Sequence, residues 1–221
     1  MESAIPIIFQ LAVLLFSVVI HEVSHGFAAQ ALGDSTARYA GRLTLNPIPH
    51  LDPLGSVVIP IATFVIPYLL GGTPAPIGWA KPVPYNPYNL RIRNRELGSA
   101  IVGAAGPLSN IAIAIAFGVL LRLLGVFVPD GASGTALQSA IATIVFINIW
   151  IAIFNLVPIP PLDGSKVLFF FLTPAWSRFR FFLEQYGFFI LLLLIFSFDG
   201  FFRILFGLAL TLFSLFTGAR F

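Results

Sequence analysis

The sequence predicts an all-α membrane protein of five or six transmembrane helices, with a short strand or β-hairpin and a re-entrant region rich in proline and glycine. Two observations predict this fold class. Hydrophobic residues make up 58% of the 221 residues and charged residues only 10%, which is too apolar a composition for a water-soluble domain. Several apolar runs also approach the roughly 20 residues that a spanning helix needs. Because no stretch remains for a soluble domain, we expect a single integral-membrane domain over residues 1–221.

The first apolar run extends from about Ala4 to Leu32 and stops at Gly33-Asp34, a typical helix end. It has neither the positive flank nor the small-residue cleavage site of a signal peptide, so we interpret it as part of the mature protein. Residues 38–45 alternate loosely between polar and apolar side chains. This alternation predicts the short strand or hairpin.

The next apolar run, from Leu54 to Leu70, is only 17 residues long and contains Pro60 and Pro67. Because it is shorter than a typical spanning helix, it is the candidate for the re-entrant region, and the alternative that it spans the bilayer stays open. Residues 71–87 are dense in glycine and proline, and arginines follow at 91, 93 and 95. This composition is typical of a loop at the membrane surface.

Two clear spanning runs follow, Ser99 to Leu124 and Thr135 to Val157, with a short turn between them. The prolines at 158, 160 and 161 must interrupt the second helix, because proline lacks a backbone donor and clashes with the preceding turn. A short helix over residues 165–172 is expected next. The chain ends in two apolar runs, 181–198 and 201–218, which predict a C-terminal helical hairpin over about 181–218 after a core of about residues 4–172.

The strongest chemical signal, His21-Glu22-Val23-Ser24-His25, lies inside the first span. Residues four apart share one face of a helix, so both imidazoles can reach one divalent ion. Glu22 beside them can act as general base toward an attacking water, as in other HExxH sites. Ionisable side chains at membrane depth are costly and usually functional. We therefore predict one Zn²⁺ ion, with His21 and His25 as ligands and Glu22 as the catalytic residue.

A catalytic zinc site needs a third protein ligand, and the chain has no cysteine. Asp163 is favoured because it follows the proline-broken helix end, and irregular backbone at membrane depth is tolerated where it lines a wet cavity. Two alternatives stay open: Asp163 caps the helix that starts at Gly164, or His50 is the ligand. The whole set of candidates is Asp34, His50, Asp52, Glu96, Asp163 and Glu184.

The distribution of Lys and Arg predicts the orientation, because these residues favour the cytoplasmic side. If the 54–70 run does not cross, Asp130 and Asp199 fall on one side with Arg203, and most cations fall on the other. The same arrangement lets Asp163 approach the two histidines. We expect an outer N-terminus and a site accessible from the cytoplasmic side of a prokaryotic cell membrane. The cations on that side are Arg38, Arg42, Lys81, Arg91, Arg93, Arg95, Lys166, Arg178, Arg180 and Arg220.

Three stretches resemble the site-2 protease group of intramembrane zinc metalloproteases. They are 21–26 (HEVSHG), 105–110 (AGPLSN) and 155–164 (NLVPIPPLDG), and the last matches the pattern NxxPxPxxDG. Residues 78–84 (GWAKPVP) are similar to the compact bacterial and archaeal branch. The likeness covers about residues 15–170. We expect neither of the PDZ and CBS domains that many members of the group carry.

The resemblance implies a zinc-dependent endopeptidase that hydrolyses peptide bonds in or near the transmembrane segments of membrane-anchored proteins. It implies that Asp163 is the third zinc ligand and that Asn155 lies near the bound substrate or its oxyanion. An interhelical hydrogen bond is the alternative for Asn155. Asn110, on a helix with the small residues Gly103 and Gly106, is expected to contact the metal ligands without binding the metal itself.

The alternative function is a polytopic transporter or channel with a non-catalytic metal site, since intramembrane His and carboxylates also line ion pathways. A transporter usually has paired halves with matching interruptions, and the one proline-broken helix has no counterpart. A purely structural membrane protein leaves Glu22 unexplained. The cations lie at the ends of apolar runs, which indicates contact with a bilayer and no nucleic-acid partner. A strand at 38–45 is a candidate to hold an unwound substrate by strand addition.

Overall fold

The computed structural model describes residues 4–69, 78, 80–127 and 132–219, and all regular structure within them is helical. Five helices in these ranges are long and apolar enough to cross a membrane, in agreement with the predicted all-α membrane class. The long helices are α1 (Ala4–Ala31), α4 (Arg95–Phe127), α5 (Ala132–Asn155), α7 (Ser177–Ser197) and α8 (Asp199–Thr217). The shorter ones are α2 (Thr36–Tyr39), η1 (Ile48–His50), η2 (Pro53–Val58), α3 (Ile59–Leu69), η3 (Pro87–Asn89), α6 (Gly164–Phe171) and η4 (Pro174–Trp176).

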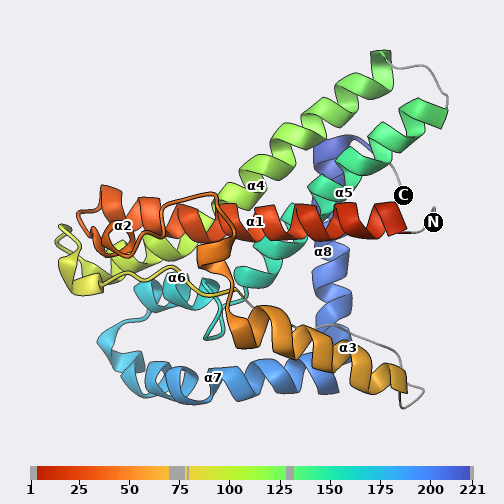
Figure 1. Ribbon diagram of the computed structural model, residues 1–221. Helices are drawn as coiled ribbons and strands as arrows, with labels where there is room; N and C mark the ends of the chain where they lie inside the picture. The colour runs from red at the N-terminus through yellow and green to blue at the C-terminus, as the bar shows by residue number, and fades with distance from the viewer. Residues whose placement is uncertain (1–3, 70–77, 79, 128–131, 220–221) are drawn as a thin grey trace.

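Helix α4 is the centre of the fold and contacts α1, α5, α6 and α8 (Figure 1). It begins at Arg95, earlier than the predicted Ser99, because Asn94 caps it. The Asn94 side-chain oxygen accepts hydrogen bonds from the N–H groups of Glu96 and Leu97, which satisfies two donors that a helix start leaves free. Arg95 and Glu96 therefore belong to the helix, while Arg91 and Arg93 precede it.

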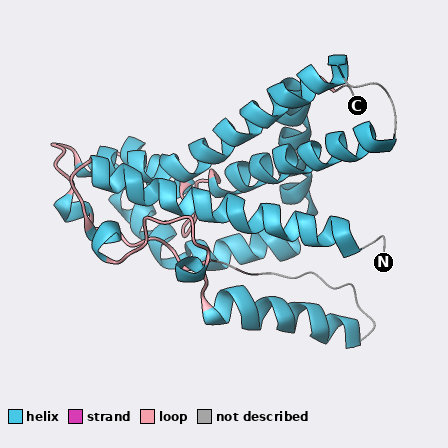
Figure 2. Cartoon of the chain, turned by 45° about the horizontal axis from the view of Figure 1, so that its top comes forward, coloured by secondary structure: helices cyan, strands magenta, loops and turns pink. Residues whose placement is uncertain are grey.

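Residues 38–45 form no strand, so the predicted strand or hairpin is wrong. Helix α2 occupies Thr36–Tyr39 and a turn follows. Asp34 favours the helix, since its carboxylate accepts hydrogen bonds from the N–H and hydroxyl of Thr36. Arg42 then turns inward, and with no partner strand beside it this segment has no strand edge to offer a substrate. Figure 2 shows the described loops gathered at the end of the bundle opposite to the N-terminus.

The proline-rich interruption lies where the sequence predicts it. Helix α5 ends at Asn155, and α6 starts at Gly164 and packs against α4. Gly103 of α4 allows this contact, because a Cβ there would lie 2.9 Å from the Lys166 side chain and 3.2 Å from the Asp163 carbonyl oxygen. The close approach brings Asp163 to the inner face of α4.

The two C-terminal helices diverge, as Figure 1 shows. The start of α7 lies at the start of α4, where Arg180 pairs with Glu96. Helix α8 instead packs on α5 and α4, and the Leu215 carbonyl accepts a hydrogen bond from Arg122, near the far end of α4. The charge distribution predicted that the C-terminus lies on the same side of the membrane as Arg95. Helix α8 instead leads toward the other end of α4, because it packs on α5 and does not fold back along α7. Asp130 and Arg220 lie outside the described residues.

The long helices carry large apolar side chains on their outer faces. On α7, for example, Phe189 is 67% exposed and Phe196 is 68% exposed. Such surfaces are unfavourable in water and suited to hydrocarbon. Between the helices, a core of Ala114, Ile141, Val145, Ile149 and Ala209 joins α4, α5 and α8. The chain is therefore an integral, multi-pass membrane protein.

Candidate metal centre

His21, Glu22 and His25 lie in the second half of α1, as the helical spacing predicts. Their ligand atoms all lie within 4.8 Å of one another. The two imidazoles are buried, with 4% and 7% exposure, because α4 packs against this face of α1. Glu22 is half-buried. Two imidazoles and a carboxylate thus converge at one point of the bundle interior.

Gly106 of α4 faces the two imidazoles. A Cβ at this position would lie 2.5 Å from Nε2 of His25 and 2.6 Å from Nε2 of His21. No side chain larger than hydrogen fits there unless a ring moves. The glycine therefore keeps a space open beside both Nε2 atoms.

Asp163 reaches the same point from the segment between α5 and α6. Its Oδ2 atom lies 3.0 Å from Nε2 of His21 and 3.0 Å from Nε2 of His25. Although Asp163 occupies the capping position of α6, its side chain makes no capping hydrogen bond. The structure thus favours the ligand interpretation of Asp163 over the capping alternative.

Lys166 holds the other oxygen of Asp163, with Nζ 2.9 Å from Oδ1. Burial raises the pKa of Asp163, but the hydrogen bonds to the two imidazoles outweigh it and hold that pKa well below its ordinary range. Burial likewise lowers the pKa of Lys166, and the charge of Asp163 more than reverses the effect. The carboxylate is therefore ionised, with one oxygen paired to Lys166 and the other directed at the histidines. The spacing of three on α6 was a signal for this pair that sequence reasoning missed.

Both imidazoles donate a hydrogen bond through Nδ1. His25 Nδ1 lies 2.6 Å from the carbonyl oxygen of Val102, and His21 Nδ1 lies 2.7 Å from Oδ1 of Asn110. A carbonyl oxygen only accepts, so each Nδ1 carries a proton, which leaves Nε2, on the side of Asp163, as the nitrogen of each ring that is available to a metal. Asn110 thus contacts the site from behind, as expected.

These donors fit a zinc ion. Bonds of about 2.0–2.1 Å arranged as a tetrahedron separate ligand atoms by about 3.4 Å, close to the 3.0 Å between Asp163 Oδ2 and each Nε2. Two imidazoles and one carboxylate are also a ligand set that zinc uses in hydrolytic enzymes. The space beside Gly106 provides room for the ion.

Glu22 is held by a backbone group that the sequence did not reveal. Its Oε2 accepts a hydrogen bond of 2.8 Å from the N–H of Val83. Val83 belongs to the 78–84 segment, whose resemblance to a family motif was the only signal. This contact fixes the direction in which the Glu22 carboxylate points.

The segment around Val83 is fixed by buried Arg42. The Arg42 Nη2 atom donates to the carbonyl oxygens of Lys81, at 2.6 Å, and Pro82, at 3.3 Å. The Lys81 N–H in turn donates to the carbonyl of His50 at 2.9 Å. Arg42 was predicted as an orientation signal and as part of a strand, yet it sets the position of the irregular segment that contacts Glu22.

The other candidate ligands have different partners. His50 is not among the residues whose ligand atoms converge with those of His21 and His25, and its Nε2 lies 2.9 Å from the Thr44 carbonyl oxygen. Asp34 and Asp52 accept local backbone hydrogen bonds. Glu96 and Glu184 both pair with Arg180.

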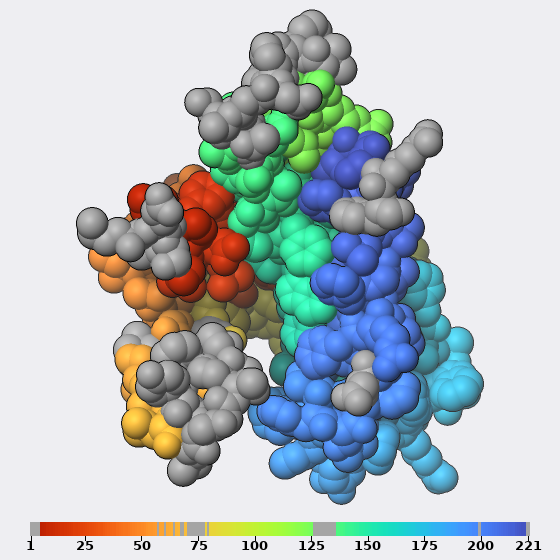
Figure 3. Space-filling view, turned by 90° about the vertical axis from the view of Figure 1, so that its right-hand side faces the viewer, coloured from red at the N-terminus to blue at the C-terminus, as the bar shows by residue number. Residues whose placement is uncertain are grey.

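A cavity of about 560 Å³ opens at the candidate metal centre, and residues of α1, α5, α7 and α8 line it. Figure 3 shows the hollow on this face of the molecule. His21, Glu22 and Asn155 line it. The Nδ2 atom of Asn155 donates to the Ile151 carbonyl of its own helix at 2.9 Å. Most of the remaining wall is apolar: Leu14, Trp150, Phe154, Leu162, Ile195 and Phe202.

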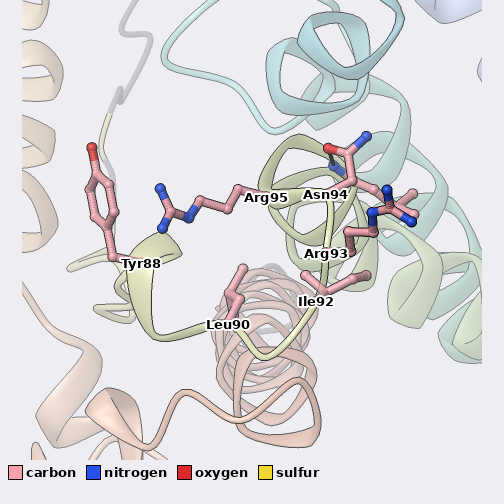
Figure 4. Close-up of a pocket in the computed structure, with 7 residues that line it drawn as sticks. Tyr88, Leu90, Ile92, Arg93, Asn94 and Arg95 are labelled. Atoms are coloured by element: carbon pink, nitrogen blue, oxygen red, sulfur yellow. Dashed lines mark hydrogen bonds between the residues drawn. The ribbon is translucent and has the colours of Figure 1, made fainter.

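A second hollow lies at the arginine collar before α4 and shares no lining residue with this cavity. Figure 4 shows the Arg95 side chain pointing toward Tyr88, with its guanidinium 4.8 Å from the ring centre. Arg93 and Asn94 point to the other side. The collar is thus separate from the metal centre.

Comparison with known proteins places this geometry in context. The family described as "Peptidase family M50" matches residues 121–194. The chain is 34% identical to "Putative zinc metalloprotease YwhC" of Bacillus subtilis over 183 residues, 82% of this chain and 77% of that protein. It is 32% identical to "Putative zinc metalloprotease Rip2" of Mycolicibacterium smegmatis over 82% of this chain and 64% of that protein. No solved structure matches.

Proposed function

Since the chain belongs to peptidase family M50, the site-2 protease group of intramembrane zinc metalloproteases, we propose that the centre between α1, α4 and α6 performs its zinc-dependent proteolysis. The family membership establishes a membrane metalloprotease that uses zinc, and the transporter alternative is not favoured. The assignment of individual residues is our proposal. It rests on the convergence of His21, His25 and Asp163 on one point.

His21, His25 and Asp163 hold the single ion through their Nε2 and Oδ2 atoms. The 3.0 Å separations and the open space beside Gly106 support this assignment. A zinc ion bound there supplies Lewis acidity, which polarises a peptide carbonyl and lowers the pKa of a water to near 7. Lys166 keeps Asp163 Oδ1 occupied, so that Oδ2 faces the imidazoles.

Glu22 is the general base. Its carboxylate takes a proton from the attacking water and passes it to the amide nitrogen of the leaving peptide. The Val83 N–H holds the carboxylate at Oε2 during both transfers. Because water is the nucleophile, no covalent acyl-enzyme forms.

The substrates are membrane-anchored proteins that offer an unwound part of a transmembrane segment. A peptide carbonyl inside a helix is hydrogen-bonded to its own chain, so unwinding must precede attack. The apolar wall of the 560 Å³ cavity suits hydrophobic side chains of such a segment. Asn155, which lines the cavity beside His21 and Glu22, positions the scissile carbonyl or its oxyanion.

The site opens toward the cytoplasm of a prokaryotic cell, and residues 53–69 re-enter the bilayer without crossing it. At 1.5 Å per residue these 17 residues reach about 25 Å, less than the roughly 30 Å hydrocarbon thickness. Nine cations expected on the cytoplasmic side support the orientation: Arg38, Arg42, Lys81, Arg91, Arg93, Arg95, Lys166, Arg178 and Arg180. Arg122, Arg203 and the end of α8 do not belong to this group.

A cleavage assay tests the proposal. Purified protein is incubated with a membrane-anchored substrate, with and without a zinc chelator, beside the variant Glu22→Gln. We expect chelation and Glu22→Gln each to abolish cleavage, and Glu22→Gln to keep one zinc per chain, because the three ligands remain. Cleavage by a zinc-loaded Glu22→Gln variant would overturn the role of Glu22 as base.

A further inference from the structure

A chain of three buried polar side chains on three helices ends on His21. Ser17 of α1, Asn110 of α4 and Asn148 of α5 are 4%, 0% and 1% exposed. Polar groups at membrane depth are costly unless they are hydrogen-bonded. Neither Ser17 nor Asn148 takes part in the chemistry proposed above, so their burial requires a different explanation.

Two backbone carbonyls show which end of each amide is the nitrogen. The Asn110 Nδ2 atom lies 3.2 Å from the Ser17 carbonyl oxygen, and the Asn148 Nδ2 atom lies 2.9 Å from the Ile144 carbonyl oxygen. A carbonyl oxygen accepts and never donates, so the amide nitrogens must face these oxygens. The Asn148 Oδ1 atom is then free to accept from Asn110 Nδ2 at 2.8 Å, and the Ser17 hydroxyl oxygen accepts from Asn148 Nδ2 at 3.0 Å.

The fixed orientation determines which nitrogen of His21 carries the proton. With Nδ2 of Asn110 facing Ser17 and Asn148, its Oδ1 faces His21 Nδ1 at 2.7 Å. The imidazole must therefore donate from Nδ1, which leaves Nε2, 3.0 Å from Asp163 Oδ2, as the nitrogen that is available to a metal. Asn148 acts on this ring without contacting it.

The two imidazoles differ in how this proton is fixed. His25 donates to the backbone carbonyl of Val102, an acceptor that cannot turn over. His21 donates to a side-chain amide, which can rotate by half a turn and present its NH₂ group. A reversed Asn110 would donate to Nδ1 and favour the proton on Nε2, where it blocks metal binding.

We propose that Asn148 is a positioning residue of the zinc centre: it holds the Asn110 amide in the one orientation that keeps His21 competent to bind zinc. The inference rests on the proposed function, in that it takes His21 as a ligand. Without Asn148, the Asn110 amide nitrogen keeps only the Ser17 carbonyl as acceptor. Loss of such supporting hydrogen bonds lowers metal affinity by about 10- to 100-fold.

Zinc affinity, measured by competition with a chromogenic chelator on the full chain in detergent, is the first test. We expect Asn148→Leu, which has the same branched shape and no polar group, to bind zinc at least about tenfold more weakly than the unchanged protein. The matched control is Thr143→Val on the same helix, because the Thr143 hydroxyl donates only to the Ser139 carbonyl of α5. Its zinc affinity should equal that of the unchanged protein.

A double variant separates positioning from packing. Asn110→Asp presents an oxygen to His21 Nδ1 in either orientation, so it no longer needs Asn148. We expect Asn148→Leu to have little or no effect on zinc affinity in the Asn110→Asp background, a coupling that mere loss of packing would not produce. Should Asn148→Leu fail to fold, Ser17→Ala tests the same series of hydrogen bonds, and we expect its zinc affinity to fall about threefold.

The outcomes are distinct. Unchanged zinc affinity in Asn148→Leu and in Ser17→Ala would overturn the proposal. It would also be overturned if Asn148→Leu lowered zinc affinity by the same factor in the Asn110→Asp background as in the unchanged protein. Failure of the unchanged protein to bind one zinc per chain would instead overturn the proposed function. Because the readout is zinc affinity, neither result depends on having a substrate.

Discussion

The two halves of the active centre are built differently. The half that we propose to hold zinc uses helices: α1 carries both histidines, Gly106 of α4 lies against them, and the segment entering α6 places Asp163 beside them. The half that holds Glu22 uses irregular chain, in which Arg42 fixes the carbonyls of Lys81 and Pro82 and so places the Val83 N–H. Metal binding and proton transfer therefore depend on separate supports.

This difference has a practical consequence. A change in the helical half should weaken zinc binding and activity together. A change in the irregular half should lower the rate of cleavage and leave zinc in place, because Val83 and Arg42 contact none of the three proposed ligands. The following substitutions test that separation.

Gly106→Ala should have the largest effect. Its Cβ would clash with both Nε2 atoms, and displacing a buried ring costs about 3 kcal/mol, or about 100-fold in zinc affinity. Zinc content after dialysis and cleavage of a membrane-anchored substrate should both collapse. Gly125→Ala on the same helix is the control, because a Cβ there meets nothing within 4 Å. Full zinc content in Gly106→Ala would contradict the assigned position of the ion.

Arg42→Gln should lower the rate of cleavage by about 10- to 100-fold, since misplacing a catalytic group by about 1 Å has this effect. Zinc content should stay at one per chain. The control is Arg38→Gln, because Arg38 is exposed on α2. Loss of zinc from Arg42→Gln would show that the two halves are not separate.

Lys166→Met should weaken zinc binding by about three- to tenfold, which corresponds to one lost hydrogen bond. The released Asp163 Oδ1 can then turn toward the imidazoles, so the carboxylate is less well positioned. Competition with a chelator measures the change. An affinity equal to that of the unchanged protein would show that Lys166 does not orient Asp163.

Asp34 should make the free energy of unfolding depend on pH, and of the residues substituted here it should affect zinc binding and cleavage least. Burial raises its pKa, but hydrogen bonds from Thr36, Asn86 and Asn89 outweigh it and lower that pKa below its ordinary value. A lowered folded pKa contributes stability above the unfolded pKa of about 3.9, and this contribution is lost as pH falls through the folded pKa. Thermal unfolding between about pH 6 and pH 3 measures it. We expect Asp34→Asn to be less stable by about 1–3 kcal/mol near neutral pH and to lose less on acidification; an unchanged pH profile would refute the role.

The sequence predicted the helical half of the centre better than the irregular half. The spacing of four residues placed His21 and His25 on one face of a helix, and the proline-broken helix end pointed to Asp163. Both signals can be found in the sequence because each depends only on neighbouring residues. The helix over residues 99–124 was also expected, and the structure extends it at both ends, to Arg95–Phe127. Its start was missed because the Asn94 cap lies among charged residues. These features follow from short-range rules of helix geometry.

The irregular half depends on contacts between distant residues. Nothing in the alternation of residues 38–45 shows that Arg42 binds carbonyls some 40 positions later, and this contact replaced the predicted strand. Asn148 likewise reads as one polar residue in an apolar run, and its role needs α1 and α4 in place. The end of α8 was misplaced for the same reason, because its packing on α5 is not encoded in its charge pattern.

X-ray absorption at the zinc edge tests the central claim most directly. In the zinc-loaded protein we expect one ion per chain with two imidazole nitrogens at about 2.0 Å and carboxylate or water oxygen in the remaining positions. The Asp163→Ala variant should lose an oxygen ligand and most of its zinc. A zinc site with two imidazoles that is unchanged in Asp163→Ala, or a pure protein with no stoichiometric zinc, would contradict the account.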